Sequence, residues 1–159
     1  MSNDEGGDQS TEAKSRRLEM QQFVEQFGLI SEESGLPRMA GRVLGWLLIC
    51  EPPHQSMNDL AEALQASKSS ISTTTRLLIR FGLIERIGLP GHRRDYFRIG
   101  SGVWHRLLRQ NFSRIAIARQ LAERGLKLLD GEDPQRRRRL EEYRDLYAFY
   151  EREMPLLLE

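Results

Sequence analysis

Residues 56–100 constrain the fold of this chain more than any other stretch, because two short amphipathic helices are followed there by a hairpin. The first helix is predicted to begin at Ser56, where Asp59 three positions on completes a capping-box pattern. A turn follows at Ala66, and Ser67 is a favoured N-cap residue for the second helix. The apolar stripe of that helix is Ile71, Leu77, Leu78 and Phe81, with Thr74 beside it. We expect the two helices to cross and to bury these stripes against each other.

A basic β-hairpin is predicted directly after the second helix. Gly82 is placed to end that helix as a C′ residue. Residues 83–87 and 95–99 are predicted to pair as strands, with turn-forming glycine and proline between them. Arg93 and Arg94 lie at the tip. This order of elements is typical of a winged helix-turn-helix, and an ordinary pair of antiparallel helices is the alternative.

The outer face of the second helix carries small hydroxyls and cations. The side chains predicted to point outward are Lys68, Ser69, Ser70, Ser72, Thr73 and Arg76. Short side chains let a helix approach base edges in a DNA major groove. A winged-helix module that binds protein and not DNA would favour large apolar residues there.

Charge is concentrated in the same part of the chain. Residues 66–98 hold seven basic and two acidic side chains, a net charge of +5, in a chain whose formal net charge is +1. Local positive charge governs affinity for phosphates. We therefore expect double-stranded DNA binding through the second helix together with Arg93 and Arg94, and a solvated basic face is the alternative.

The expected fold class is mainly α with a small β-hairpin wing: a winged helix-turn-helix plus long terminal dimerisation helices. Residues 1–13, rich in acidic residues, Gly and Ser, are predicted to be disordered. Residues 14–53 are expected to form N-terminal helices for dimerisation and core, residues 54–100 the winged helix-turn-helix, and residues 101–159 C-terminal dimerisation helices. The outer helices are predicted over residues 14–34, 37–50, 103–129 and 134–154.

The helix predicted over residues 103–129 has more apolar surface than one small domain can cover. At 1.5 Å per residue it would be roughly 40 Å long. A second copy of the chain, packed about a two-fold axis, would cover the stripe. A homodimer is expected, and a helical hairpin folded back on its own domain is the alternative.

Residues 23–53 and 56–100 together resemble the GbsR-like branch of the MarR superfamily of winged helix-turn-helix transcriptional regulators. The resemblance covers about residues 15–155 and is most specific in SGLPRMAGR, SKSSIS and RRDYFRI. It implies a homodimer that binds an operator through the second helix, and a repressor more often than an activator.

The wing distinguishes this sequence from the commoner MarR pattern, in which an Asp-x-Arg pair lies at the tip. Here Arg93 and Arg94 precede Asp95, which is similar to the GbsR-like arrangement. Which of the two arginines enters the minor groove is left open.

Small-molecule control would need an effector pocket. We expect one where the apolar helix with Trp46 could meet the long helix with Trp104 and Phe112. The same three residues would serve equally well as core.

Other chemistry has little support in the sequence. Cys50 follows an apolar helix and is interpreted as a core residue and not as a redox switch. His54, His92 and His105 lack the spacing of metal ligands, although His92 in the wing tip could touch a phosphate. With no catalytic motif present, neither an enzyme nor a cofactor is expected.

Four consecutive arginines occupy residues 136–139. They could form a DNA-binding arm, but pairing of Arg137 with Glu141 and of Arg138 with Glu142 along one helix explains them more simply.

Residues 1–17 are polar with no apolar core, and the longest apolar run, residues 44–50, is too short to span a bilayer. A cytoplasmic protein without membrane contact is expected.

Overall fold

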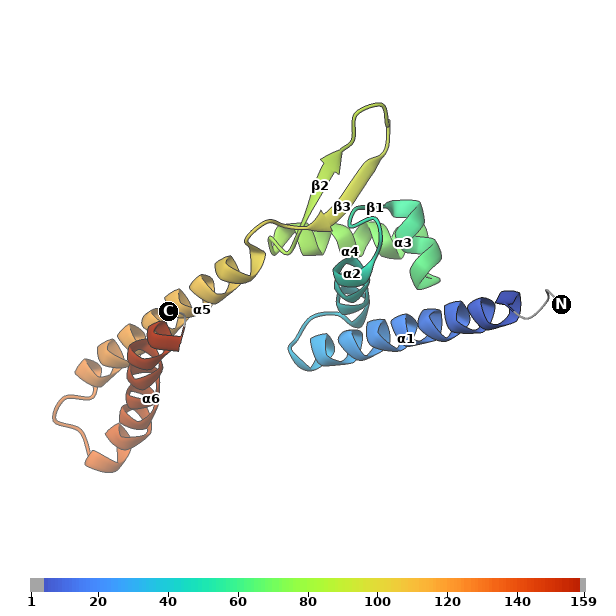
Figure 1. Ribbon diagram of the computed structural model, residues 1–159. Helices are drawn as coiled ribbons and strands as arrows, with labels where there is room; N and C mark the ends of the chain where they lie inside the picture. The colour runs from blue at the N-terminus through green and yellow to red at the C-terminus, as the bar shows by residue number, and fades with distance from the viewer. Residues whose placement is uncertain (1–4, 158–159) are drawn as a thin grey trace. The chain divides into compact units, whose positions relative to one another are not determined.

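The computed structural model describes residues 5–157, and these residues divide into two compact units, with the boundary between Val103 and Trp104. The first unit contains α1 (Glu5–Glu33), α2 (Arg38–Ile49), β1 (Gln55–Ser56), α3 (Met57–Leu64), α4 (Lys68–Arg80), β2 (Ile84–Gly88) and β3 (Asp95–Ile99) (Figure 1). The second contains α5 (Val103–Leu128) from its second residue on, α6 (Pro134–Glu153) and the 3₁₀ turn η1 (Met154–Leu157). The fold is mainly helical with a small antiparallel sheet, as predicted.

α1 begins earlier than the sequence predicted. The composition of residues 1–13 predicted disorder, but residues 5–13 belong to α1, and residues 1–4 lie outside the described part. Each residue added to an existing helix gains a backbone hydrogen bond without the cost of nucleation.

The predicted caps of the helix-turn-helix are confirmed. The Ser56 hydroxyl accepts a hydrogen bond from the Asp59 backbone N–H at 3.1 Å, and the Asp59 carboxylate accepts one from the Ser56 N–H at 2.8 Å. The Ser67 hydroxyl accepts from the Ser70 N–H at 3.1 Å. Gly82, with φ +71°, follows α4 in the left-handed conformation that glycine tolerates best.

The core of the first unit lies where α2, α3 and α4 meet. Its least exposed apolar side chains include Val43, Leu60, Leu64, Ile71 and Leu78. The expectation that Phe81 is buried is wrong: this side chain is 47% exposed, because it lies at the C-cap, beyond the last buried turn of α4. Thr75, which the apolar pattern did not select, is 2% exposed, and its hydroxyl donates to the Ser72 carbonyl at 3.1 Å.

α1 and α2 cross at small residues. A Cβ added to Gly41 would lie 2.5 Å from the Ser31 Cβ and 2.9 Å from the Gly28 Cα. A Cβ added to Gly45 would lie 2.9 Å from the Phe27 Cβ. The two helices therefore approach each other more closely than residues with larger side chains would allow.

The sheet has a strand that the sequence did not predict. Its order is β1-β3-β2, and β3 pairs antiparallel with both neighbours. Phe97 of β3 lies opposite Gln55 of β1 and Arg86 of β2, and it is 4% exposed. The Gln55 side chain also accepts a hydrogen bond from Trp46 Nε1 at 3.1 Å. The wing is thus attached to the helices through β3 and the short strand β1.

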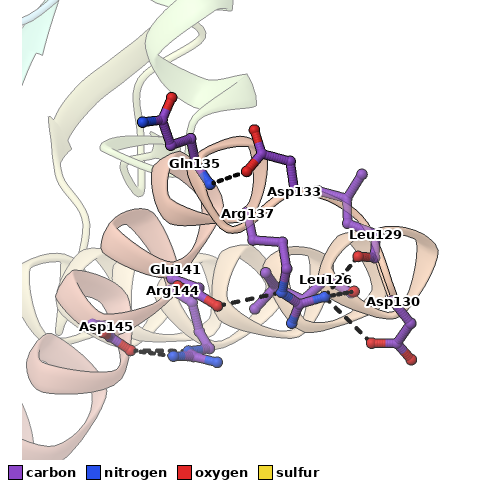
Figure 2. Close-up of polar contacts among 9 residues, drawn as sticks. All are labelled: Leu126, Leu129, Asp130, Asp133, Gln135, Arg137, Glu141, Arg144 and Asp145. Carbon is purple, nitrogen blue, oxygen red and sulfur yellow. Dashed lines mark hydrogen bonds and ion pairs between the residues drawn. The ribbon is translucent and has the colours of Figure 1, made fainter.

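The second unit is a helical hairpin joined by arginines. Figure 2 shows the Arg137 guanidinium donating to the carbonyl oxygens of Leu126 (3.1 Å) and Leu129 (2.8 Å) at the end of α5. The predicted pair with Glu141 is present at 3.5 Å. Both carbonyls also accept backbone N–H bonds, from Leu129 and Glu132, so Arg137 adds a second donor to each and ties α6 to the end of α5. The predicted pair of Arg138 with Glu142 is also present, at 2.9 Å.

Much of the apolar surface of this hairpin is exposed. In the described part of α6 no residue is buried. The exposed large apolar side chains of the unit are Trp104, Leu108, Ile117, Leu121, Leu128, Tyr143, Leu146, Phe149 and Tyr150. Two helices packed only on each other bury little apolar surface.

Candidate nucleic-acid interface

The predicted outer face of α4 is accessible. Lys68, Ser69, Thr73 and Arg76 are exposed, and Ser70 and Ser72 are half-buried. The opposite face holds Ile71, Thr74, Thr75 and Leu78, all buried against the unit's core. The burial of that face leaves the hydroxyls and cations directed toward solvent.

The N-terminal end of α4 suits contact with an anionic partner. Its first turn contains no acidic residue and begins with the exposed Lys68. The backbone N–H groups of a helix N-terminus carry partial positive charge. The charge of the helix end and the charge of the lysine therefore add.

Large apolar side chains are exposed only near the other end of this helix. Ile79 is 37% exposed and Phe81 is 47% exposed. The half of α4 that carries Lys68 and Thr73 exposes no large apolar side chain. The exposed surface of that half is therefore polar, which is typical of helices that contact base edges.

The arginines of the wing fall into two kinds. Arg98 forms a 2.6 Å ion pair with Glu85, and Arg86 lies 3.7 Å from the Asp95 carboxylate. Arg93 and Arg94 are exposed, and neither has a carboxylate partner among residues 5–157. Uncompensated positive charge is therefore concentrated at the tip, where sequence reasoning placed it.

The tip itself is an ordered turn. The His92 N–H donates to the Leu89 carbonyl at 3.1 Å, which closes a four-residue turn. Pro90 and Gly91 occupy its centre, and Gly91 has φ +79°. This is the residue pattern of a type II turn, in which the third position requires a positive φ. Arg93 and Arg94 follow the turn and precede β3.

A groove between α1 and α3 was not foreseen from the sequence. It has a volume of about 1240 Å³, and its lining includes Arg16, Arg17, Trp46, Asp59 and Glu62. Its walls come from segments far apart in the chain, so no local motif marks it. The lining mixes acidic and basic side chains and thus selects no obvious ligand charge.

Residues of the expected effector site belong to different units. Trp46, in the first unit, is half-buried and held by its hydrogen bond to Gln55. Trp104, 45% exposed, and the half-buried Phe112 are in the second unit. The effector site stays a prediction.

Cys50 lies in an unreactive environment. It is 7% exposed, and its thiol donates to the Pro52 carbonyl at 3.3 Å. Burial raises the pKa of this thiol to about 11. Since the thiolate is the reactive form, the environment disfavours redox chemistry at this position.

In residues 5–157, no cluster of three or more His, Cys, Asp or Glu is arranged to hold a metal ion. Over the same range, no helix combines the length and the apolar character needed to cross a membrane.

A helix pair with an accessible polar helix, followed by a basic wing, defines a winged-helix DNA-binding protein. Residues 34–95 match the MarR family, and residues 102–159 match the family described as MmpR5-like MarR family transcriptional regulator. The HTH-type transcriptional regulator MmpR5 of Mycobacterium tuberculosis is 47% identical to this chain over 133 residues, which are 84% of this chain and 81% of that protein. The chain belongs to the MarR family of winged-helix transcriptional regulators, and it is similar to MmpR5.

A solved structure agrees with this assignment. A crystal structure described as that of a transcriptional regulator has a TM-score of 0.66 and 47% sequence identity, and the match covers 84% of this chain and 90% of the other. The proteins of this family are transcriptional regulators and not enzymes. The narrower GbsR-like assignment is not confirmed by these comparisons.

Proposed function

We propose that this regulator is a homodimeric, sequence-specific repressor, in which α4 enters the major groove of operator DNA and the wing contacts the backbone or the minor groove. The observation that carries the proposal is the division of the wing arginines. Arg86 and Arg98 are paired with carboxylates, whereas Arg93 and Arg94 are free to meet phosphates.

The polar face of α4 supports the second part of the proposal. Lys68 and Arg76 are exposed near both ends of a row of hydroxyls that includes Thr73. Arginine can donate two hydrogen bonds to guanine, and short hydroxyl side chains allow close approach to neighbouring bases. α4 would therefore supply base recognition, while the wing would supply affinity that is independent of sequence.

The exposed apolar surface supports a dimer. In the second unit Ile117 is 59% exposed, Leu121 57% and Leu128 84%. In α1, Leu18 is 58% and Ile30 64% exposed. A second copy of this chain is the occupant that we propose for these surfaces. Two copies related by a two-fold axis would read two half-sites about 10 bp apart, or a multiple of this spacing.

Repression enters the proposal through the resemblance to the superfamily, whereas a cytoplasmic location and control by a small molecule are carried over as expectations from the sequence. An effector can shift DNA affinity only as far as it binds one state better than the other. Trp46 and Trp104 are the two tryptophans of the chain, so their fluorescence can report a ligand titration while DNA affinity is followed in parallel. A compound that changes only one signal would not be the effector.

The experiment that tests the DNA proposal is selection of genomic DNA fragments by the purified protein, followed by sequencing. We expect one enriched duplex motif with two-fold symmetry. A protein carrying both Arg93→Ala and Arg94→Ala is the matched control and should recover much less DNA. If the wild-type protein enriches no duplex motif, the proposed function is wrong, and a protein-binding winged helix becomes the better description.

A further inference from the structure

Three aromatic rings meet beside the tip of the wing. The Tyr96 ring lies edge-on to His92, with ring centroids 5.7 Å apart, and edge-on to His54, with centroids 5.4 Å apart. The Tyr96 hydroxyl lies 3.1 Å from His92 Nδ1, which is hydrogen-bond distance. No role for this cluster follows from the proposed groove contacts.

The backbone of Tyr96 is held in place by the sheet. It belongs to β3, the central strand, where it lies opposite Ser56 of β1 and Ile87 of β2. Its side chain is half-buried. A residue paired on both sides within a sheet has little freedom to move, so its hydroxyl is a firm attachment for a neighbouring loop.

His92 is attached at two points. Its backbone N–H donates to the Leu89 carbonyl and closes the turn, and its ring nitrogen Nδ1 is hydrogen-bonded to the Tyr96 hydroxyl. Arg93 and Arg94 lie between His92 and Tyr96 in the chain. Both ends of the short segment that carries the free arginines are therefore held.

We propose that Tyr96 is a positioning residue for DNA binding, whose hydroxyl holds His92 and thereby fixes the backbone that presents Arg93 and Arg94 to the DNA phosphates. The proposal rests on the proposed function, because it assumes that these arginines contact DNA. Ordering the tip before binding lowers the entropy lost when the complex forms. The Tyr96–His92 pair would therefore raise affinity without touching DNA.

The test is the DNA affinity of Tyr96→Phe, which removes the hydroxyl and keeps the ring. Loss of one hydrogen bond predicts binding that is weaker by about two- to tenfold. His92→Phe breaks the same bond from the exposed side and should weaken binding to a similar extent. His105→Phe, at an exposed position of α5, removes an imidazole elsewhere and should bind as the wild type does.

Two combined variants separate positioning from direct contact. If the two residues act through one hydrogen bond, the double variant Tyr96→Phe/His92→Phe should bind no more weakly than either single variant. In a protein that already carries Arg93→Ala and Arg94→Ala, Tyr96→Phe should have no effect. Additive losses, or a loss that persists without the arginines, would show that Tyr96 or His92 acts separately and would overturn the proposal.

Three different results would contradict the proposed function, the role of the tip and the positioning role of Tyr96. Wild-type protein that does not bind duplex DNA contradicts the proposed function. Wild-type binding that is insensitive to Arg93→Ala and Arg94→Ala contradicts the role of the tip. If both controls behave as expected and Tyr96→Phe binds at the wild-type level with an unchanged unfolding temperature, the positioning role is wrong. Should Tyr96→Phe fail to fold, His92→Phe tests the same bond and decides the outcome.

Discussion

The Arg42 guanidinium donates a hydrogen bond at 2.9 Å to the backbone carbonyl of Leu64, the last residue of α3. The same guanidinium donates at 2.7 Å to Glu25 of α1. The carbonyls at the end of a helix have no partner within it, so Arg42 caps α3 from α2. One side chain thus joins α1, α2 and the first helix of the helix-turn-helix.

Arg42→Lys should lower the free energy of unfolding by about 1–2 kcal/mol, because one ammonium group cannot reproduce the arrangement of guanidinium donors. Urea unfolding monitored by circular dichroism measures the change. Arg38→Lys is the control, since Arg38 meets Glu25 at 3.5 Å with both side chains well exposed. The control should cost less than about 0.5 kcal/mol, and equal losses in the two variants would contradict the capping role of Arg42.

Gly41→Ala should destabilise the protein although alanine favours helix. The added methyl group would lie 2.5 Å from the Ser31 Cβ and 2.9 Å from the Gly28 Cα, so α1 and α2 must separate. Overpacking of this kind costs about 1–3 kcal/mol, partly offset by a gain in helix propensity of about 1 kcal/mol. Thermal unfolding should show a lower midpoint than for Gly88→Ala, whose new methyl group meets nothing within 4 Å. A more stable Gly41→Ala protein would mean that the two helices are not closely packed.

Cys50 should resist alkylation in the folded protein. Burial raises the pKa of its thiol from 9.0 to about 11, so the thiolate fraction at pH 8 falls by about a hundredfold. The rate at which Cys50 is alkylated should rise with pH and become substantial only as the pH approaches the raised pKa of the thiol. Iodoacetamide labelling followed by mass spectrometry, with urea-unfolded protein as the control, measures this. Rapid labelling of the native protein at pH 8 would contradict the buried environment.

The protein should sediment as a dimer at low micromolar concentration. Leu121 is 57% exposed on α5, and Leu121→Lys would place a charge on the surface that we propose for the second copy. The variant should shift the equilibrium toward monomer, because burying an unpaired charge is unfavourable. Gln110→Lys adds the same charge at an exposed polar position and serves as the control. A folded wild-type monomer at this concentration would contradict the proposed interface.

Arg94→Ala should weaken binding to all DNA sequences and reduce its dependence on salt, because a phosphate contact is lost. Thr73→Ala and Arg76→Ala should each relax discrimination at particular base pairs by about 1–3 kcal/mol. Fluorescence anisotropy with operator and scrambled duplexes measures both effects. The charge-neutral double variant Arg98→Ala/Glu85→Ala is the control, since it removes an ion pair that is already compensated. A larger effect from this control than from Arg94→Ala would reverse the assignment of the free arginines.

Much of the helix-turn-helix could be predicted because its signals are local. Ser56 and Asp59, three positions apart, form two hydrogen bonds with each other, and Ser67 and Ser70 form one at the same spacing. Interactions over one helical turn depend on local sequence and hardly on the rest of the fold. The polar face of α4 was predictable for a related reason, since a fixed helical period decides which side chains share a face.

Contacts between distant segments were not predictable in this way. β1 exists because Gln55 pairs with Phe97, and two residues have no strand signal of their own. The length of α1 was also misjudged, since the composition of residues 5–13 predicted disorder where the helix continues.

Local patterns in the sequence predicted the helix-turn-helix with its caps, the basic hairpin and the row of hydroxyls and cations on α4. The packing of the folded chain selects which arginines are free: strand register brings Arg98 to Glu85 and Arg86 to Asp95, and leaves Arg93 and Arg94 without a carboxylate among the described residues. It also decided that Arg42 reaches Leu64. Backbone preferences act between neighbours in the chain, whereas ion pairs and close helix crossings depend on how separate segments pack.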